Sequence, residues 1–277
     1  MKKILIFGSQ GMLGMDLFEI LQEDYEIIPF SRFNLDLSEV EKIIPTIEKF
    51  KPDIVINAAA WTDTEKAENK KFQDTVTLIN AIAPREMAKA CDKINAHLIH
   101  YSTDFVFDGE DEKFYTEDEE KKPINFYGLS KAHGEDFVQN NCSNYSIIRL
   151  SWLFGKNGPS FVKKMLQLGN HEKRIDVVND ITISISHSKD VAKYTKKLID
   201  ERLDKNKNIF HFVNEGAFTL YDLTKLIFEI KEKTIELNPV SHDIFENIVK
   251  RPRHAVLLNT RFEKLPAAEN ALGDFID

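Results

Sequence analysis

The stretch that decides the fold is ILIFGSQGMLG, residues 4–14 of the 277-residue chain. A short apolar run at residues 4–7 leads directly into Gly8, Gly11 and Gly14, and residues 12–21 then repeat apolar side chains with helical spacing. A buried strand, a glycine turn and a helix in this order predict dinucleotide binding, because glycine lets a pyrophosphate approach the main chain at a helix N-terminus. The alternative interpretation is a flexible turn that binds nothing.

The rest of the first half alternates short apolar runs with longer amphipathic stretches. We expect strands at residues 26–30, 54–56, 97–101 and 146–150, and helices at residues 39–50, 76–95 and 125–140. Continuous apolar strands separated by helices indicate a parallel sheet that is covered on both faces. Right-handed crossovers then favour a doubly wound, Rossmann-type α/β fold.

The alternation loosens after about residue 150. We therefore expect a dinucleotide-binding domain at residues 1–150 and a second, smaller α/β domain at residues 151–277 that mainly binds substrate. In this second part, the predicted helices are residues 161–168, 188–202 and 219–229, and a strand at 209–213 could return to the main sheet. The segment EDEKFYTEDEEKK, residues 110–122, is dense in charge, so we expect a solvated surface excursion, with a flap over the substrate as the alternative.

The composition limits the partners and the location of the chain. A net charge of -8 argues against nucleic acid and against anionic membranes, which attract basic surfaces. No segment approaches the roughly 18 apolar residues of a membrane span. The two cysteines, Cys91 and Cys142, suit free thiols in a reducing compartment, so a cytoplasmic location is expected. The eight histidines lack the spacing of metal ligands, and we predict no metal site.

The end of the second strand should meet the adenosine ribose of a dinucleotide. An acidic residue there would bind the ribose hydroxyls and favour NAD. This chain has Ser31 and Arg32 instead, and a guanidinium suits a 2′-phosphate. We predict NADPH as the preferred cofactor, with use of NADH, or an Arg32 that only faces solvent, as the alternatives.

A tyrosine and a lysine open the predicted helix at residues 125–140. Tyr127 and Lys131 are four residues apart and share a helix face. An ammonium near a phenol lowers its pKa from about 10, so Tyr127 could protonate a carbonyl oxygen as hydride reaches the carbon. Thr103, at the end of the fourth strand, could donate a hydrogen bond to the same oxygen. The alternative for Tyr127 is an interfacial tyrosine without a catalytic role. Tyr221 and Lys225 repeat the four-residue spacing late in the chain, where we expect an ordinary helix face.

Six stretches carry a resemblance to a known family. They read GSQGMLG, INAAAWTDTEKAE, HYSTDFVFDG, FYGLSKAHGE, RLSWLFG and KRPRHAVLLNTRFEKL. In order and spacing the chain resembles the dTDP-4-dehydrorhamnose reductases, which are extended short-chain dehydrogenases, from Lys3 to about Leu265. The resemblance implies reduction of the C4 ketone of a nucleotide-linked 4-keto-6-deoxy sugar by NAD(P)H, in the biosynthesis of deoxysugars and surface polysaccharides.

The resemblance also implies a role for individual residues. Tyr127 would be the acid, Lys131 would bind the nicotinamide ribose and lower the pKa of Tyr127, and Thr103 would orient the substrate carbonyl. Asp104 and Trp152 would face the sugar. The implied cofactor contacts are Gly11, Met12 and Leu13 at the pyrophosphate, Asp36 and Leu37 beside the adenine, and Ala58, Ala59 and Ala60 along the cofactor path.

The chain departs from the family pattern at three places. Phe105 stands where the family usually has tyrosine, and the C-terminal tail lacks a tryptophan that is common there. Residues 181–186 read ITISIS where the family usually continues Gln-x-Gly-x-Pro-Thr, in a stretch expected to help build the sugar site. Reductase chemistry is therefore better supported than rhamnose as the sugar.

Two other functions remain open on the sequence alone. An epimerase or dehydratase acting on nucleotide sugars would share this scaffold but would need further acid–base residues. A non-catalytic NADP-binding partner, such as the regulatory subunit of methionine adenosyltransferase, also resembles these reductases. The expected partners are a nucleotide-sugar substrate and, as one arrangement, a second copy of the chain in a homodimer.

Overall fold

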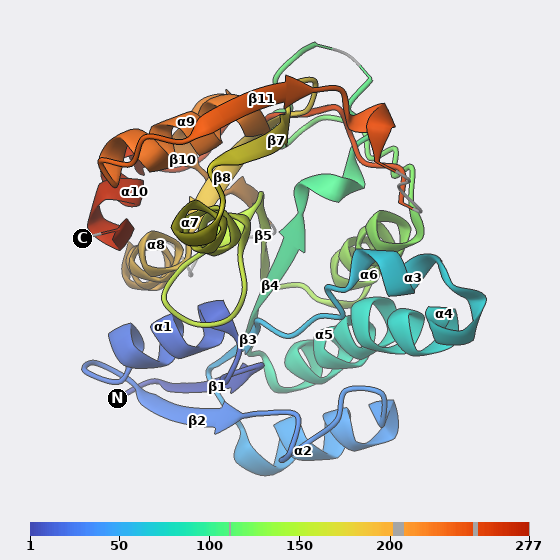
Figure 1. Cartoon of the computed structure of the whole chain (residues 1–277). Coiled ribbons are helices and arrows are strands. Elements are labelled where there is room, and N and C mark those ends of the chain that lie inside the picture. The colour runs from blue at the N-terminus through green and yellow to red at the C-terminus, as the bar shows by residue number, and fades with distance from the viewer. Residues whose placement is uncertain (111, 202–207, 246–248, 277) are drawn as a thin grey trace.

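A parallel sheet organises the N-terminal half of the computed structural model, which describes residues 1–110, 112–201, 208–245 and 249–276. Within these residues the sheet has six strands in the order β2-β1-β3-β4-β5-β9 (Figure 1). The strands are β1 (Lys3–Phe7), β2 (Glu26–Phe30), β3 (Ile54–Asn57), β4 (His97–Thr103), β5 (Tyr145–Leu150) and β9 (Asn208–His211). All neighbouring pairs are parallel, which confirms the predicted doubly wound α/β fold.

Helices cover both faces of this sheet (Figure 1). They are α1 (Met12–Leu21) and α8 (Ser188–Glu201) on one face, and α2 (Ile43–Phe50), α5 (Ala83–Ile94) and α6 (Phe126–Asn141) on the other. Side chains alternate along β1, so Ile4 and Ile6 join the core under α1 and α8 while Leu5 joins the core under α2 and α5. Each such side chain contributes about 1.5–3 kcal/mol by burial, which explains why the strand is apolar throughout.

The predicted helix at residues 76–95 is really three connected segments. A helix α4 (Lys70–Thr77) and α5 are joined by one stretch of π-helix, Leu78–Ile82. Pro84 lacks an N–H group, so the carbonyl of Asn80 has no ordinary α-helical donor at this point. The predicted helix at residues 39–50 is likewise split into a 3-10 turn, Val40–Lys42, and α2.

A second lobe follows β5 and is built on smaller sheets. One sheet runs β12-β8-β10-β13 with β6 added to β8, and β7 pairs with β11. Its strands are β6 (Leu153–Phe154), β7 (Arg174–Val178), β8 (Thr182–His187), β10 (Asn214–Thr219), β11 (Glu236–Val240), β12 (His254–Ala255) and β13 (Leu265–Ala267). Its helices are α7 (Phe161–His171), α9 (Leu220–Ile230) and α10 (Ala268–Ile276). Residue 202, where the sequence predicted the end of α8, lies outside the described residues.

The charge-dense segment at residues 110–122 is not simply a solvated excursion. Tyr115 and Glu117 are each only 3% exposed. The Tyr115 ring stacks on Phe107 at 4.3 Å between centroids, and the Glu117 carboxylate accepts a hydrogen bond from the Thr260 hydroxyl at 2.6 Å. The surface prediction was wrong for these two residues because Tyr115 stacks on Phe107 and forms a β-bridge with Leu257, while Glu117 binds Thr260.

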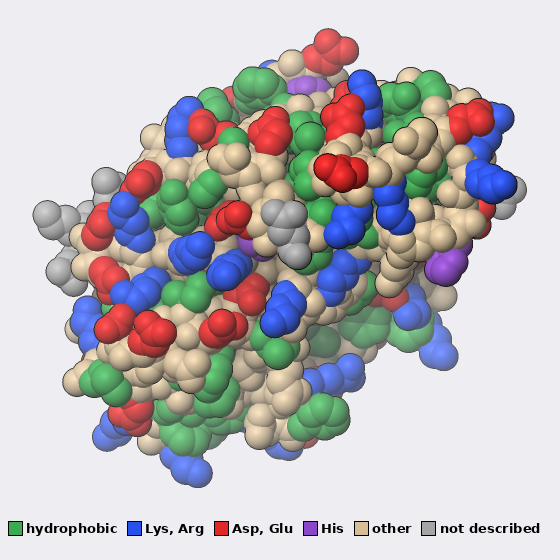
Figure 2. All heavy atoms as spheres, turned by 60° about the vertical axis from the view of Figure 1, so that its left-hand side comes forward, with side chains coloured by type: hydrophobic (Ala, Val, Ile, Leu, Met, Phe, Trp, Pro, Cys, Tyr) green, Lys and Arg blue, Asp and Glu red, His purple; other side chains and the backbone are tan. Residues whose placement is uncertain are grey.

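The surface of the described residues carries no large single-sign patch on the face shown in Figure 2, where acidic and basic side chains are interspersed. No described helix combines the length and the apolar composition that crossing a membrane requires.

Candidate active site

A cavity of about 850 Å³ opens where the carboxyl ends of the parallel strands meet the second lobe. The ends of parallel strands are where doubly wound sheets bind ligands. With one exception, the residues predicted as site residues line this cavity: Gly8, Gly11, Met12, Leu13, Ser31, Arg32, Asp36, Leu37, Ala58, Ala59, Ala60, Thr103, Asp104, Tyr127, Lys131 and Trp152. The exception is Gly14, which lies beneath the turn. Residues that lie more than a hundred positions apart in the sequence therefore line the same cavity.

The glycine turn after β1 is shaped by close backbone contacts. Gly8 has a φ of 81°, and a Cβ atom there would lie 2.7 Å from the Ala59 nitrogen. A Cβ atom on Gly14 would lie 2.0 Å from the Gly8 oxygen. Gly11 precedes α1 and supplies no side-chain cap, and the first turn of α1 holds no acidic residue. The helix N-terminus is therefore left for an anion, and the turn fits the pyrophosphate of a dinucleotide.

The end of the cavity that is expected to hold adenosine lies beside β2. The Arg32 Nε atom donates to the Asp36 carboxylate at 3.0 Å, and the Arg32 side chain is 78% exposed. Hydrogen bonds from Ser38 and the charge of Arg32 lower the pKa of Asp36. Asp36 holds Arg32 at the rim, where its guanidinium can be reached by a ligand.

Tyr127 is positioned by the N-terminus of α6. The Asn125 side chain accepts a hydrogen bond from the Gly128 N–H at 2.7 Å and caps the helix. Gly128 allows α6 to approach the segment after β4, since a Cβ atom there would lie 2.1 Å from the Phe105 oxygen. Phe105 packs edge-on against the Tyr127 ring at 5.6 Å. The departure from tyrosine at position 105 thus places an apolar ring against the proposed acid.

The proton affinity of Tyr127 is set by its surroundings. Burial raises the pKa of Tyr127 to about 12, hydrogen bonding with Thr103 lowers it, and the charge of Asp104 raises it. The Lys131 ammonium instead donates to the Tyr101 carbonyl oxygen at 2.7 Å. The lowering of the Tyr127 pKa by Lys131 that the sequence suggested is not seen in this arrangement, in which the phenol stays protonated.

Lys131 is itself almost fully buried. Burial lowers the pKa of Lys131 to about 8, and the charge of Glu135 acts in the opposite direction. The Lys131 Nζ atom lies 3.5 Å from Nε2 of His100, whose pKa burial holds well below its usual range. A neutral His100 therefore faces the ammonium.

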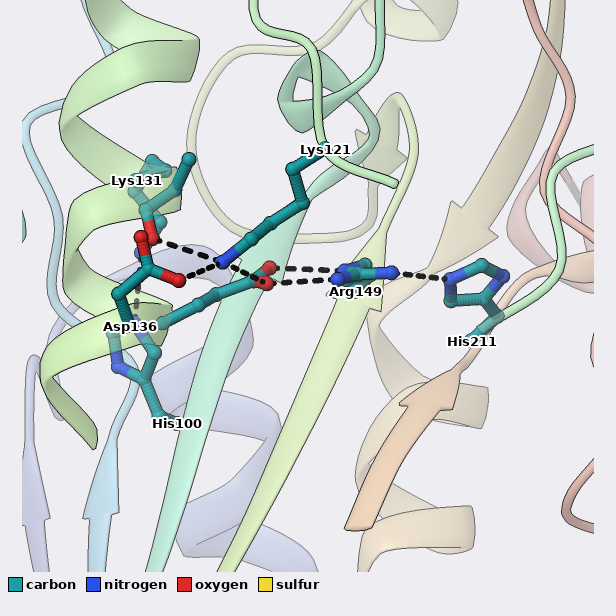
Figure 3. Close-up of polar contacts among 8 residues, drawn as sticks. His100, Lys121, Lys131, Asp136, Arg149 and His211 are labelled. Atoms are coloured by element: carbon teal, nitrogen blue, oxygen red, sulfur yellow. Dashed lines mark hydrogen bonds and ion pairs between the residues drawn. The ribbon is translucent and has the colours of Figure 1, made fainter. Parts of the chain in front are cut away.

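A buried ion-pair network lies behind Lys131 (Figure 3). Arg149 donates to both carboxylate oxygens of Glu135, at 2.9 and 2.8 Å, while Lys121 lies 3.4 Å from the same carboxylate. Burial alone would raise the pKa of Glu135, but the charge of Arg149 outweighs it and the pKa falls to about 2. On the far side, Arg149 Nη1 lies 3.4 Å from His211 Nε2. Sequence reasoning missed this network, although Glu135 follows Lys131 by one helical turn.

Asp104 lines the end of the cavity that is expected to bind the substrate. Its carboxylate accepts hydrogen bonds from Thr103 at 2.9 Å and from Ser151 at 2.7 Å. Burial raises the pKa of Asp104 to about 6, and these hydrogen bonds oppose that shift. The Ser151 hydroxyl also lies 2.9 Å from the Ser184 carbonyl oxygen. Ser151 therefore connects Asp104 to β8.

The altered stretch at residues 181–186 does not line the cavity. The expectation that this stretch helps to build the sugar site stays a prediction. Most of it belongs to the buried strand β8, where Ser184 and Ser186 bond to main-chain atoms of Leu257 and Phe212. Ser184 and Ser186 both accept hydrogen bonds from Ser151, which in turn binds Asp104 of the cavity.

Trp152 and Tyr221 have different placements. Trp152 has a left-handed φ of 38°, lines the cavity and packs edge-on against Phe161 at 5.5 Å. Tyr221 and Lys225 lie in α9, away from the cavity. Position in the fold, and not the spacing of the two residues, distinguishes Tyr127 from Tyr221.

Several lining residues were missed by sequence reasoning. They are Gln10, Trp61, Thr62, Thr64, Tyr101, Ser102 and Arg251. Trp61, Thr62 and Thr64 belong to the stretch INAAAWTDTEKAE, and Arg251 to KRPRHAVLLNTRFEKL, so the available signal was their place inside these stretches.

Known proteins resemble the chain over nearly its whole length. The model of the RmlD substrate binding domain family matches residues 1–276. The dTDP-4-dehydrorhamnose reductase of Escherichia coli (strain K12) is 32% identical over 273 residues, covering 94% of this chain and 91% of the relative. The dTDP-4-keto-6-deoxy-D-glucose reductase of Streptomyces niveus is 31% identical, covering 91% of this chain and 87% of the relative. A crystal structure of dTDP-4-dehydrorhamnose reductase from Bacillus anthracis in complex with NADP has a TM-score of 0.93 and 34% identity, covering 99% of this chain and 98% of that one. The chain belongs to the dTDP-4-dehydrorhamnose reductase family.

Proposed function

We propose that this chain reduces the C4 ketone of a dTDP-linked 4-keto-6-deoxy sugar with NADPH, as a step in the biosynthesis of deoxysugars and polysaccharides. One observation carries the proposal: a single cavity holds the glycine turn at one end and Tyr127, Thr103 and Asp104 at the other. The names of the two reductase relatives support the same reaction on a dTDP-sugar. The NADP complex of the Bacillus anthracis structure supports the cofactor.

The cofactor would be held by residues of the first half of the chain. Gly8, Gly11 and the N-terminus of α1 would bind the pyrophosphate, and Arg32 the 2′-phosphate. Ala58 to Ala60, after β3, leave room along its path because their side chains are small. Lys131 would bind the nicotinamide ribose. When bound, NADPH supplies the hydride that the reduction needs.

Residues of the chain would supply the proton and would orient the substrate carbonyl. Tyr127, with its pKa raised by burial to about 12, carries its proton at neutral pH and would deliver it as hydride reaches the carbon, when the carbonyl oxygen becomes a stronger base than the phenolate. Thr103 holds that oxygen beside the phenol by a hydrogen bond. Asp104 and Trp152 would contact the sugar on either side, since both line the same end of the cavity.

We further propose that the two halves of the chain bind different ligands. Residues 1–150 would bind the cofactor, and residues 151–277 would mainly bind the sugar, apart from β9, which pairs with β5 in the first sheet, and α8, which covers one face of that sheet. A cytoplasmic location is supported by the two buried free thiols, Cys91 and Cys142, because such thiols persist in a reducing compartment. Light scattering of the purified chain would test for a homodimer.

The reaction is tested with the purified chain, NADPH and two substrates in separate reactions, dTDP-4-dehydrorhamnose and dTDP-4-keto-6-deoxy-D-glucose. We expect oxidation of one NADPH for each sugar alcohol formed, with the product identified by mass spectrometry and NMR. A rearranged or dehydrated sugar without net loss of NADPH would favour an epimerase or dehydratase. NADPH binding without oxidation by either sugar would favour a regulatory subunit.

A further inference from the structure

Arg251 is a cation at the cavity for which the described residues provide no partner. Three described cations line this space: Arg32, Lys131 and Arg251. Arg32 is paired with Asp36, and Lys131 donates to the Tyr101 carbonyl oxygen. Arg251 has no hydrogen bond or ion pair within the described parts of the chain, although it is half-buried. A guanidinium that is partly removed from water without a hydrogen-bonding partner is costly unless a ligand provides one.

The backbone on both sides of Arg251 is fixed. The Lys250 carbonyl oxygen accepts a hydrogen bond from the Asn125 side chain at 2.9 Å. Pro252 packs against Gly109, where a Cβ atom would lie 2.6 Å from the Pro252 Cβ atom. The position of Arg251 therefore follows from two contacts with the first lobe, and one of them is the residue that caps α6.

The surroundings of Arg251 identify the end of the cavity at which it acts. Burial lowers the pKa of Arg251, while the charges of Glu65 and Asp104 raise it, so the guanidinium remains charged and lies near Asp104. Thr62 and Thr64 line the same cavity and can add hydroxyl donors. The glycine turn and Arg32 would serve the phosphates of the cofactor, which leaves Arg251 for an anionic group of the second ligand.

We propose that Arg251 binds the diphosphate that joins the nucleotide to the sugar, and so fixes the distance of the sugar ring from Tyr127. This inference rests on the proposed function, because it takes the second ligand to be a nucleotide sugar. The sugar ring of such a substrate is neutral, and its charge lies on the diphosphate. The planar fork of arginine matches phosphate oxygens in a bidentate geometry that a lysine cannot reproduce.

The test compares the binding of dTDP and of thymidine to the NADP-loaded protein by calorimetry. The variants are Arg251→Gln and, as a matched control, Arg253→Gln, since Arg253 is exposed and paired with Asp243. Wild type should bind dTDP more tightly than thymidine. Arg251→Gln should weaken dTDP binding by roughly 10- to 100-fold, the effect of a lost charge-assisted hydrogen bond, and leave thymidine binding unchanged. Arg253→Gln should behave as wild type.

Three further measurements make the result specific to the diphosphate. The dissociation constant of NADPH and the melting temperature should be the same in wild type and both variants, which excludes a general loss of structure. With a sugar substrate, Arg251→Gln should raise KM and also lower kcat, because the sugar ring is no longer held at a fixed distance from Tyr127. Arg251→Lys should lie between wild type and Arg251→Gln because it keeps the charge and loses the fork.

The outcomes separate this inference from the proposed reduction. Equal dTDP binding by wild type and Arg251→Gln, or equal losses in Arg251→Gln and Arg253→Gln, would overturn the role of Arg251. So would a wild type that binds dTDP no more tightly than thymidine. If dTDP binding depends on Arg251 but neither sugar oxidises NADPH, the reduction fails and the assignment of Arg251 stands.

Discussion

Lys131 and Glu135 lie one helical turn apart in α6, and both side chains are almost fully buried. The carboxylate of Glu135 counteracts the effect of burial on the Lys131 ammonium. The pair connects the residue proposed to bind the nicotinamide ribose to the network of Arg149 and Lys121 (Figure 3). The charge of Lys131 thus depends on a residue that does not line the cavity.

This relationship predicts a pH dependence. Since the pKa of Lys131 is lowered to about 8 from a usual 10.5, its charged form is lost as the pH rises through about 8. We expect kcat/KM for NADPH to fall on the alkaline side with a midpoint near that pH. Glu135→Gln removes a charge that raises the Lys131 pKa, so the midpoint should move to lower pH. Asp136→Asn, at the half-exposed neighbouring residue, is the control. An unchanged midpoint in Glu135→Gln would contradict this coupling.

Tyr127→Phe removes the proposed proton donor and little volume. Turnover of the sugar should fall by roughly 10²- to 10⁴-fold, the usual contribution of general acid catalysis. NADPH affinity, measured by fluorescence titration, should change little. Tyr221→Phe is a matched control, because Tyr221 also precedes a lysine by four residues but lies away from the cavity. Near-normal turnover by Tyr127→Phe would show that another group is the acid.

Arg32→Ala tests the cofactor preference. Loss of a charged contact to the 2′-phosphate should lower kcat/KM for NADPH by roughly 10- to 100-fold. The value for NADH should stay within a small factor of wild type, because NADH has no phosphate at that position. Steady-state kinetics with both cofactors provide the comparison, and equal losses for the two would argue that Arg32 does not distinguish them.

Gly14→Ala tests the packing under the glycine turn. The added Cβ atom would lie 2.0 Å from the Gly8 oxygen, so the turn must move. We expect a loss of about 1–3 kcal/mol in the free energy of unfolding, together with weaker NADPH binding. Gly273→Ala is the control: no atom lies within 4 Å of its added Cβ, and a gain of about 0.5–1 kcal/mol is expected within a helix. Urea denaturation measures both, and equal stabilities would contradict the steric argument.

Arg149→Met breaks the buried ion pair from one side. Removal of one partner leaves Glu135 charged and without its bidentate donor, which should lower the free energy of unfolding by about 3–5 kcal/mol. Glu229→Gln breaks the pair with Lys225, whose members are about 60% exposed, and should cost less than about 1 kcal/mol. A small effect of Arg149→Met in guanidinium denaturation would mean that Lys121 is a sufficient partner.

The parts of the fold that local sequence dictates could be predicted. Gly8, Gly11 and the apolar run before them define a strand, a turn and a helix without help from distant residues, and the predicted parallel sheet was confirmed. The π-helix could not be predicted from hydrophobic spacing, which does not distinguish one continuous helix from three connected segments. Tyr115 was also missed, since its burial depends on distant residues such as Leu257, with which it forms an isolated β-bridge.

The residues that line the cofactor end of the cavity could be predicted from the sequence more completely than those at the substrate end. Residues of the glycine turn and of α6 could be identified because they stand in local patterns at the ends of strands. Arg251 and Ser151 could not, because their roles depend on which lobe faces the cavity and on contacts across long separations in the chain. The roles of the residues at the substrate end remain predictions that the variants above address.

The two hydrogen bonds of the Asn125 side chain limit how residues 250 and 251 can move relative to α6. One oxygen of its side chain caps α6, and the nitrogen of the same amide holds the carbonyl oxygen of Lys250. If the second lobe rocks to admit a ligand or release a product, residues 250 and 251 are tethered to α6 and travel with it. Arg251, which would bind the ligand, and Tyr127, which would donate the proton, would then stay at the same distance from each other whenever the two lobes open.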